Sequence, residues 1–208
     1  RIGARFQMRS ARGVSAAMWK RYRVLLVAAL AVLLGDQLTK LWALGRLTTA
    51  LDGDVSALRV FYGAPPPAGF DGLHFRPNDR IVFSGDVVAL GYVENKGAAF
   101  GSFSNVPEQY RAPLFHLVSI GAVLLALYYW GQLRGARDER LARVGLPLVL
   151  GGALGNVVDR VTRGFVIDFI DVHWGERLGP AFNLADAALV TGVALLFVDA
   201  FVRKPSKA

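Results

Sequence analysis

The amino-acid sequence predicts a membrane protein of the all-α class, with four transmembrane helices and a small extracytoplasmic β-sheet and loop region. The chain of 208 residues is 53% hydrophobic and 19% charged, so it is more apolar and less charged than a typical soluble domain. Its charged residues also gather between four long apolar runs, each close to the roughly 20 residues that a helix needs to span a bilayer. This composition excludes a disordered chain, and the absence of cysteine excludes a disulfide scaffold.

The first helix is predicted over about residues 24–44. Segment 1–23 before it has seven basic residues and no acid, and the apolar run is interrupted by Asp36 and Lys40. A cleaved signal peptide is the competing interpretation. Two charged residues do not suit the core of a signal peptide, and no small-residue cleavage site follows cleanly. We therefore expect a basic cytoplasmic segment followed by one membrane-embedded domain, residues 24–202.

The first connection, about residues 45–111, is predicted to contain the small sheet. Three consecutive prolines at 65–67 mark an irregular insertion. In segment 80–100, short β-branched runs are separated by Gly85 and Gly91, a pattern typical of short strands. We expect these strands to lie at the membrane surface.

Three more helices are predicted from the remaining apolar runs, over about residues 112–133, 141–159 and 181–202. The connection 159–177 between the last two is expected to be an irregular loop. Residues 203–208 are expected to form a short cytoplasmic tail.

The distribution of basic residues predicts the orientation of the chain. With the N-terminus inside, the cytoplasmic segments hold 14 basic and two acidic residues, whereas the two outer connections hold both signs in near balance. By the positive-inside rule, both termini face the cytoplasm and the two long connections face outward. Topology thus explains the net charge of +8 without a nucleic-acid partner, and no nucleic-acid-binding motif is present.

Polar residues from three predicted helices are expected at one depth, on the outer side of the membrane. They are Asp36, Asn156, Asp159, Asn183 and Asp186. An ionisable side chain at the bilayer centre costs about 2.5–3.5 kcal/mol on insertion scales, so each one needs a partner or a function. The convergence of three helices at one depth indicates a site.

The same residues also have structural interpretations. Asp36 and Lys40 have the i,i+4 spacing of a helical ion pair, and the two Asn–Asp pairs at i,i+3 suit hydrogen bonds between helices. A non-catalytic assembly factor would need no more than this. A proton- or ion-coupled transporter is a further alternative, because intramembrane carboxylates also mark ion paths.

The sequence lacks the motifs of the common hydrolases. There is no H-E-x-x-H zinc motif, no G-x-S-x-G nucleophile elbow and no cysteine, so neither a metal nor a cofactor is expected. Carboxylates remain as the candidate chemical groups. Two aspartates in a confined site share a proton, so that one acts as an acid and the other as a base toward water. Taken from the residues alone, Asp186 is the favoured member of such a pair.

Five sequence blocks, in order along the chain, resemble those of the lipoprotein signal peptidases, the bacterial type II signal peptidase family. The blocks are residues 35–40 (GDQLTK), 93–101 (VENKGAAFG), 151–160 (GGALGNVVDR), 166–169 (VIDF) and 182–186 (FNLAD). Each block alone is modest evidence. Five in order, on a chain with four predicted spans, are specific.

The resemblance implies an aspartyl endopeptidase of the bacterial cytoplasmic (inner) membrane, with its active site toward the extracytoplasmic side. Such enzymes cut the signal peptide from diacylglyceryl-modified prolipoproteins, just before the lipidated cysteine. The family's catalytic aspartates fall on Asp168 and Asp186, of which Asp168 is supplied by the resemblance alone. Supporting, substrate-binding positions fall on Asp36, Lys40, Asn95, Asn156, Asp159, Arg160 and Asn183. The implied partners are the diacylated prolipoprotein and membrane lipid, and the enzyme is expected to be a monomer.

Overall fold

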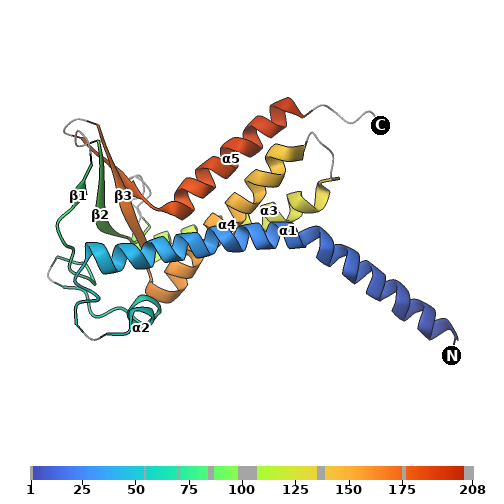
Figure 1. Ribbon diagram of the computed structural model, residues 1–208, viewed down its shortest axis with the longest axis horizontal. Coiled ribbons are helices and arrows are strands. Elements are labelled where there is room, and N and C mark those ends of the chain that lie inside the picture. The colour runs from blue at the N-terminus through green and yellow to red at the C-terminus, as the bar shows by residue number, and fades with distance from the viewer. Residues whose placement is uncertain are drawn as a thin grey trace.

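The structure is a computed structural model that describes residues 2–53, 55–69, 71–83, 87–97, 107–134, 139–174 and 177–203. These residues form five helices and four strands. In chain order the elements are α1 (Ile2–Leu47), α2 (Ala57–Tyr62), β1 (Ile81–Val82), β2 (Val88–Asn95), α3 (Glu108–Gln132), α4 (Arg140–Arg163), β3 (Val166–Trp174), β4 (Arg177–Phe182) and α5 (Leu184–Val202). Four helices are long and apolar enough to cross a membrane, as predicted: α3, α4, α5 and the Trp19–Leu47 part of α1. Figure 1 shows the sheet at one end of the helices, away from the start of α1 and the end of α5.

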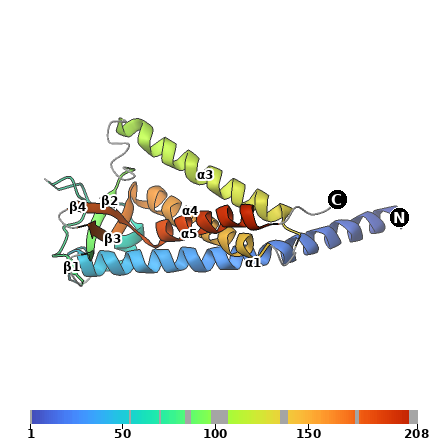
Figure 2. The same ribbon diagram turned by 90° about the horizontal axis from the view of Figure 1, so that it is seen from above.

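The first helix is longer than predicted. The sequence suggested a start near residue 24, but α1 is continuous from Ile2 and includes the basic segment. In Figure 2 its N-terminal part projects beyond the other helices.

Helix α4 forms the centre of the bundle and packs against α1, α3 and α5. In the most apolar 18-residue stretch of α4, 61% of the residues are buried, whereas the buried share is 11–28% in the corresponding stretches of the other three spans. Glycines permit the close approach of neighbouring helices. A Cβ atom on Gly151 would collide with Val32 of α1, and one on Gly152 would collide with the Ala185 carbonyl of α5. Figure 2 shows α3 diverging from α4 and α5 toward the sheet end.

Helices α4 and α5 meet through a reciprocal pair of glycines. A Cβ on Gly145 would lie 2.8 Å from the Gly192 carbonyl oxygen, and one on Gly192 would lie 2.7 Å from the Gly145 carbonyl oxygen. We therefore expect Gly192→Val to force the helices apart and to lower the free energy of unfolding by about 1–3 kcal/mol. Gly121→Val on α3, where a new Cβ meets nothing within 4 Å, is the matched control. Thermal unfolding in detergent checks this, and equal melting temperatures for the two variants would contradict it.

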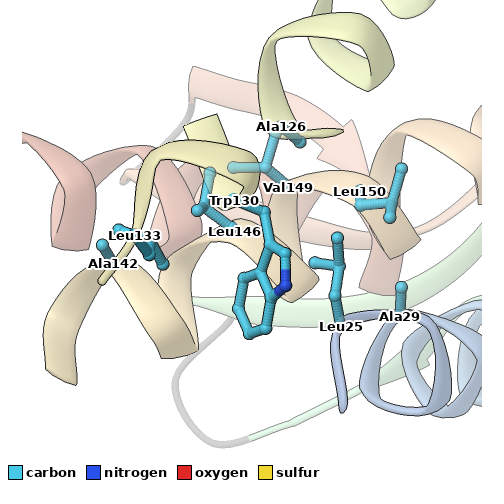
Figure 3. Packing of buried hydrophobic residues seen from close by; sticks show 9 residues of the cluster. All are labelled: Leu25, Ala29, Ala126, Trp130, Leu133, Ala142, Leu146, Val149 and Leu150. Carbon is cyan, nitrogen blue, oxygen red and sulfur yellow. The ribbon is translucent and has the colours of Figure 1, made fainter. Parts of the chain in front are cut away.

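Two hydrophobic clusters stabilise the two ends of the molecule. The first joins α1, α3 and α4 far from the sheet, around Trp130, Leu25 and Leu146 (Figure 3). The second lies between the C-terminal end of α1 and the sheet, and includes Phe61 and Phe165. The sheet is thus held on the helical bundle by its own apolar core.

The sheet is larger than the sequence predicted. Its order is β1-β2-β3-β4, and all neighbouring strands are antiparallel. Strands β1 and β2 come from segment 80–100, as expected. Strands β3 and β4 come from the connection between α4 and α5, which was predicted to be an irregular loop; that prediction was wrong. β-Branched and aromatic residues favour a strand there, and the aspartates among them obscure the pattern.

Candidate active site

Asp168 is held in the middle of β3 by two asparagines. Its side chain is 1% exposed, and both of its carboxyl oxygens accept hydrogen bonds. Asn95, at the end of β2, donates to Oδ2 at 2.9 Å, and Asn183 donates to Oδ1 at 2.6 Å. The pairing of Val93 with Asp168 between β2 and β3 brings Asn95 within reach. The β-sheet therefore fixes the position of this carboxyl group.

Asp186 lies in the first turn of α5 and forms a capping box with Asn183. The Asn183 side chain accepts the Asp186 backbone N–H at 3.0 Å, and the Asn183 backbone N–H donates to the Asp186 carboxyl at 3.4 Å. Asn156 of α4 donates to the other carboxyl oxygen at 2.7 Å. One Asn183 side chain therefore connects the two aspartates, since its oxygen caps the helix of Asp186 and its nitrogen holds Asp168.

Burial and, to a smaller extent, the nearby charge of Asp186 raise the pKa of Asp168 to about 7, against the opposing effect of the hydrogen bonds from Asn95 and Asn183. The cause is the cost of an ionised carboxylate in a site that excludes water. Near neutral pH this carboxyl group therefore exchanges a proton readily, as a general acid must.

A second buried network lies beneath the two aspartates and centres on Lys40. Its ammonium group contacts Asp36 at 2.8 Å, Asp159 at 2.9 Å and the side-chain oxygen of Asn156 at 3.2 Å. The three charged side chains are fully buried. Because Asn156 in turn donates to Asp186, Lys40 orients a direct partner of the candidate pair.

The carboxylates of this network also fix the backbone beside each candidate aspartate. Asp159 accepts the backbone N–H of Ile167 at 3.2 Å, one residue before Asp168. Asp36 accepts the backbone N–H of Ala185 at 3.0 Å, one residue before Asp186. The two carboxylates therefore position the two aspartates through the main chain.

A pocket of about 250 Å³ opens beside Asp186, between α3, α4 and α5. Asn95, Asn156 and Arg160 provide other polar groups in its lining. The remaining wall is mainly apolar and consists of Phe115, Val118, Ser119, Leu189, Val190, Ala181 and Phe182. Asp168 is not part of the described lining, but it accepts a hydrogen bond from Asn95, which is. The pocket thus combines an apolar wall with one polar corner that contains a carboxylate, a cation and two amides.

Arg160 extends over this pocket from the last turns of α4. Its guanidinium group lies 5.2 Å from the centre of the Phe115 ring and donates to the Asn156 backbone carbonyl at 3.4 Å. A guanidinium group has five donors, so others are available to a ligand. Arg160 is therefore positioned to donate a hydrogen bond to a carbonyl oxygen in the polar corner of the pocket.

All nine residues singled out in the sequence lie in or directly beneath this site. The expected Asp36–Lys40 ion pair is present, and Asn156 and Asn183 bond between helices at 3.3 Å. No group of three His, Asp or Glu side chains is placed to hold a metal ion within the described ranges.

Two participants were missed in the sequence, Gln37 and Arg163. Gln37 donates to Asp159 at 2.8 Å and to Asp36 at 3.1 Å. Arg163 bonds Asp159, donates to the Phe61 carbonyl at 2.7 Å and stacks on the Phe61 ring. Arg163 could have been predicted from its i,i+4 spacing to Asp159, which is typical of a helical ion pair.

Comparisons with known proteins place the chain in a family. The family model for signal peptidase (SPase) II matches residues 28–202. A lipoprotein signal peptidase of Anaeromyxobacter sp. (strain Fw109-5) is 40% identical over 187 residues, which are 86% of this chain and 83% of that protein. Another, of Syntrophotalea carbinolica, is 47% identical over 109 residues, 52% of this chain and 65% of its own length.

A solved structure, described as a bacterial membrane enzyme at 2.3 Å resolution, supports the fold. It matches with a TM-score of 0.59 and 24% identity, covering 88% of this chain and 93% of its own. Together with the match of the family model over most of the sequence, these findings show that the chain belongs to the signal peptidase II family of membrane aspartic peptidases.

Proposed function

We propose that this enzyme hydrolyses the peptide bond before the lipidated cysteine of diacylglyceryl-modified prolipoproteins, with Asp168 and Asp186 as its catalytic pair. The observation that supports this most strongly is the link between the two aspartates through the Asn183 side chain, which donates to the Asp168 carboxyl group and accepts the Asp186 backbone N–H. In addition, Asp186 lines a mainly apolar pocket, and a lipidated substrate in a membrane requires such a surface.

In the proposed mechanism, the two aspartates divide the proton transfers. Asp186 removes a proton from water, which attacks the carbonyl carbon of the peptide bond, while Asp168 donates its proton to the carbonyl oxygen. The tetrahedral intermediate then collapses. Asp186 returns its proton to the leaving amine, and the intermediate returns a proton to Asp168, so the enzyme is regenerated without a covalent intermediate.

The substrate would be held by the two kinds of surface in the pocket. Phe115, Val118 and Leu189 offer contacts for the acyl chains. Arg160 and Asn95 offer donors for the peptide carbonyls beside the bond that is cut. Holding the peptide in line with the aspartates contributes to the rate by proximity.

The protein is a multi-pass protein of the bacterial inner membrane, and the site is proposed to face outward. The cytoplasmic segments of that orientation hold 14 basic and two acidic residues. The sheet, whose strand β3 contains Asp168, lies at the end of the molecule away from the start of α1 (Figure 1). In this proposal, residues 24–202 form the peptidase domain, with cytoplasmic flanks at both ends. A monomer suffices, because one chain supplies every group named in the mechanism.

A direct assay tests this function. The purified protein in detergent is incubated with a diacylated prolipoprotein and with the same precursor without its lipid. We expect a shortened product that begins at the lipidated cysteine, and only from the first substrate. Cleavage of both precursors at equal rates would contradict the role of the apolar pocket.

The pH dependence of cleavage gives a sharper prediction. The rate is expected to fall as the pH rises through about 7, because Asp168 then loses the proton that it donates. Asn95→Ala removes an amide that favours the ionised carboxylate, so the pKa of Asp168 rises and the basic limb moves to higher pH. The measurement is the pH profile of kcat/KM for both proteins. A limb that moves to lower pH would contradict this role of Asp168.

A further inference from the structure

A second polar pocket lies at the opposite end of the bundle from the sheet. Its volume is about 370 Å³, and it is formed by α1, the start of α4 and the end of α3. Its described lining consists of Lys20, Arg21, Val24, Trp130, Leu133 and Arg143, of which three are cations and none is an acid. The peptidase mechanism uses none of these side chains.

The floor of this pocket is rigid. The Arg21 guanidinium group bonds the backbone carbonyls of Gly131 and Leu133, at the end of α3. In return, the indole N–H of Trp130 donates to the Arg21 carbonyl at 2.9 Å. Trp130 and Leu133 are almost fully buried and belong to the hydrophobic cluster in Figure 3. The pocket is therefore formed before any ligand arrives.

The other two cations of the pocket have no acidic partner. Lys20 and Arg143 are exposed, and no carboxylate in the described ranges lies within 4 Å of their charged nitrogens. Asp199, on the neighbouring end of α5, already pairs with Arg203 at 2.8 Å and accepts the Ala142 backbone N–H. The pocket therefore gathers three cations that form no ion pair with any carboxylate in the described ranges, which favours an anion.

Apolar surface continues from this pocket along α1. Val24, at its rim, is 61% exposed, and Val27 and Leu30 on the next turns are also exposed. A ligand with a charged head and apolar tails would therefore place its head on the cations and its tails along α1. Tryptophan and basic residues at the end of a span are typical of the headgroup region of a membrane.

We propose that this pocket binds the phosphate headgroup of an anionic glycerophospholipid from the cytoplasmic leaflet. Lys20 and Arg143 contact the phosphate, and Arg21 fixes the pocket between the helices. The acyl chains lie against the exposed face of α1. The site is separate from the peptidase site and does not depend on the proposed catalytic mechanism.

Native mass spectrometry of the purified protein, with lipid added, tests the proposal. We expect phosphatidylglycerol to bind at least tenfold more tightly than phosphatidylcholine. The double variant Lys20→Gln/Arg143→Gln should weaken phosphatidylglycerol binding about twenty-fivefold, since each basic residue near a lipid surface contributes about fivefold. Prolipoprotein cleavage in detergent should be unchanged, which shows that the variant is folded.

The matched control is Arg23→Gln/Arg140→Gln. It removes two basic residues from the same ends of α1 and α4, but neither lines the pocket. This control should retain phosphatidylglycerol binding. An equal loss in both double variants, or equal binding of the two lipids, would overturn the pocket as a specific site. Soluble glycerophosphate at millimolar concentration should not displace the lipid; displacement would overturn the lipid as the ligand.

Discussion

Asp168→Asn and Asp186→Asn are each expected to lower the rate of prolipoprotein cleavage about a thousandfold or more. Each substitution removes one of the two groups that move protons in the proposed reaction, and such groups contribute about 10²–10⁴-fold. The loss should appear in kcat rather than in substrate binding. Single-turnover cleavage of a diacylated prolipoprotein by the purified variants is the measurement.

The fold should survive both substitutions. Asparagine has nearly the same shape and keeps one acceptor oxygen, so one of the two hydrogen bonds now made to each carboxyl group can be retained. Asp171→Asn is the matched control, because Asp171 is a buried aspartate on the same strand and pairs with Arg80 at 3.5 Å. Its variant should cleave at close to the normal rate. Near-normal turnover in Asp168→Asn or Asp186→Asn, with all three proteins folded, would refute the catalytic pair.

Lys40→Met is expected to have the largest effect on stability. It leaves Asp36 and Asp159 buried without the ammonium group that lies 2.8–2.9 Å from both. Breaking a buried ion pair by removing one partner costs about 3–5 kcal/mol, because the remaining charge is uncompensated. Thermal unfolding in detergent measures the loss.

A double variant separates this explanation from a simple packing defect. In Asp36→Asn/Lys40→Met the two removed charges cancel, and the ion pair of Asp159 with Arg163 remains. The asparagine introduced in place of Asp36 still offers an oxygen to the Ala185 backbone N–H. We expect the double variant to be more stable than Lys40→Met alone. A double variant that is less stable than the single one would show that charge balance is not the reason.

The helical part of the site could be predicted because helix geometry is local. A rise of about 1.5 Å per residue fixes the depth of a side chain once the ends of its span are known. Asp36, Asn156 and Asp186 could therefore be placed at one level from their positions in three apolar runs. The structure brings them into one network, as that reasoning required.

The strand part could not be predicted in the same way. Asp168 reaches the site only because β3 pairs with β2, which is more than 70 residues away in the chain. No periodicity within the α4–α5 connection specifies that pairing. The family resemblance identified Asp168 where the residues themselves did not. Arg163 is a different case, because its i,i+4 spacing from Asp159 is local and could have indicated the ion pair from the sequence.

The distribution of the site along the chain has a consequence for biogenesis. The Lys40 network begins in the first span, whereas Asp186 and its cap belong to the last one. While the ribosome is still synthesising the chain, the inserted part holds Asp168 without Asn183 or Asp186. With Asp168 and Asp186 as the proposed catalytic pair, we therefore expect proteolytic competence only after α5 enters the membrane, and we expect nascent, partly inserted chains to leave their neighbours uncut.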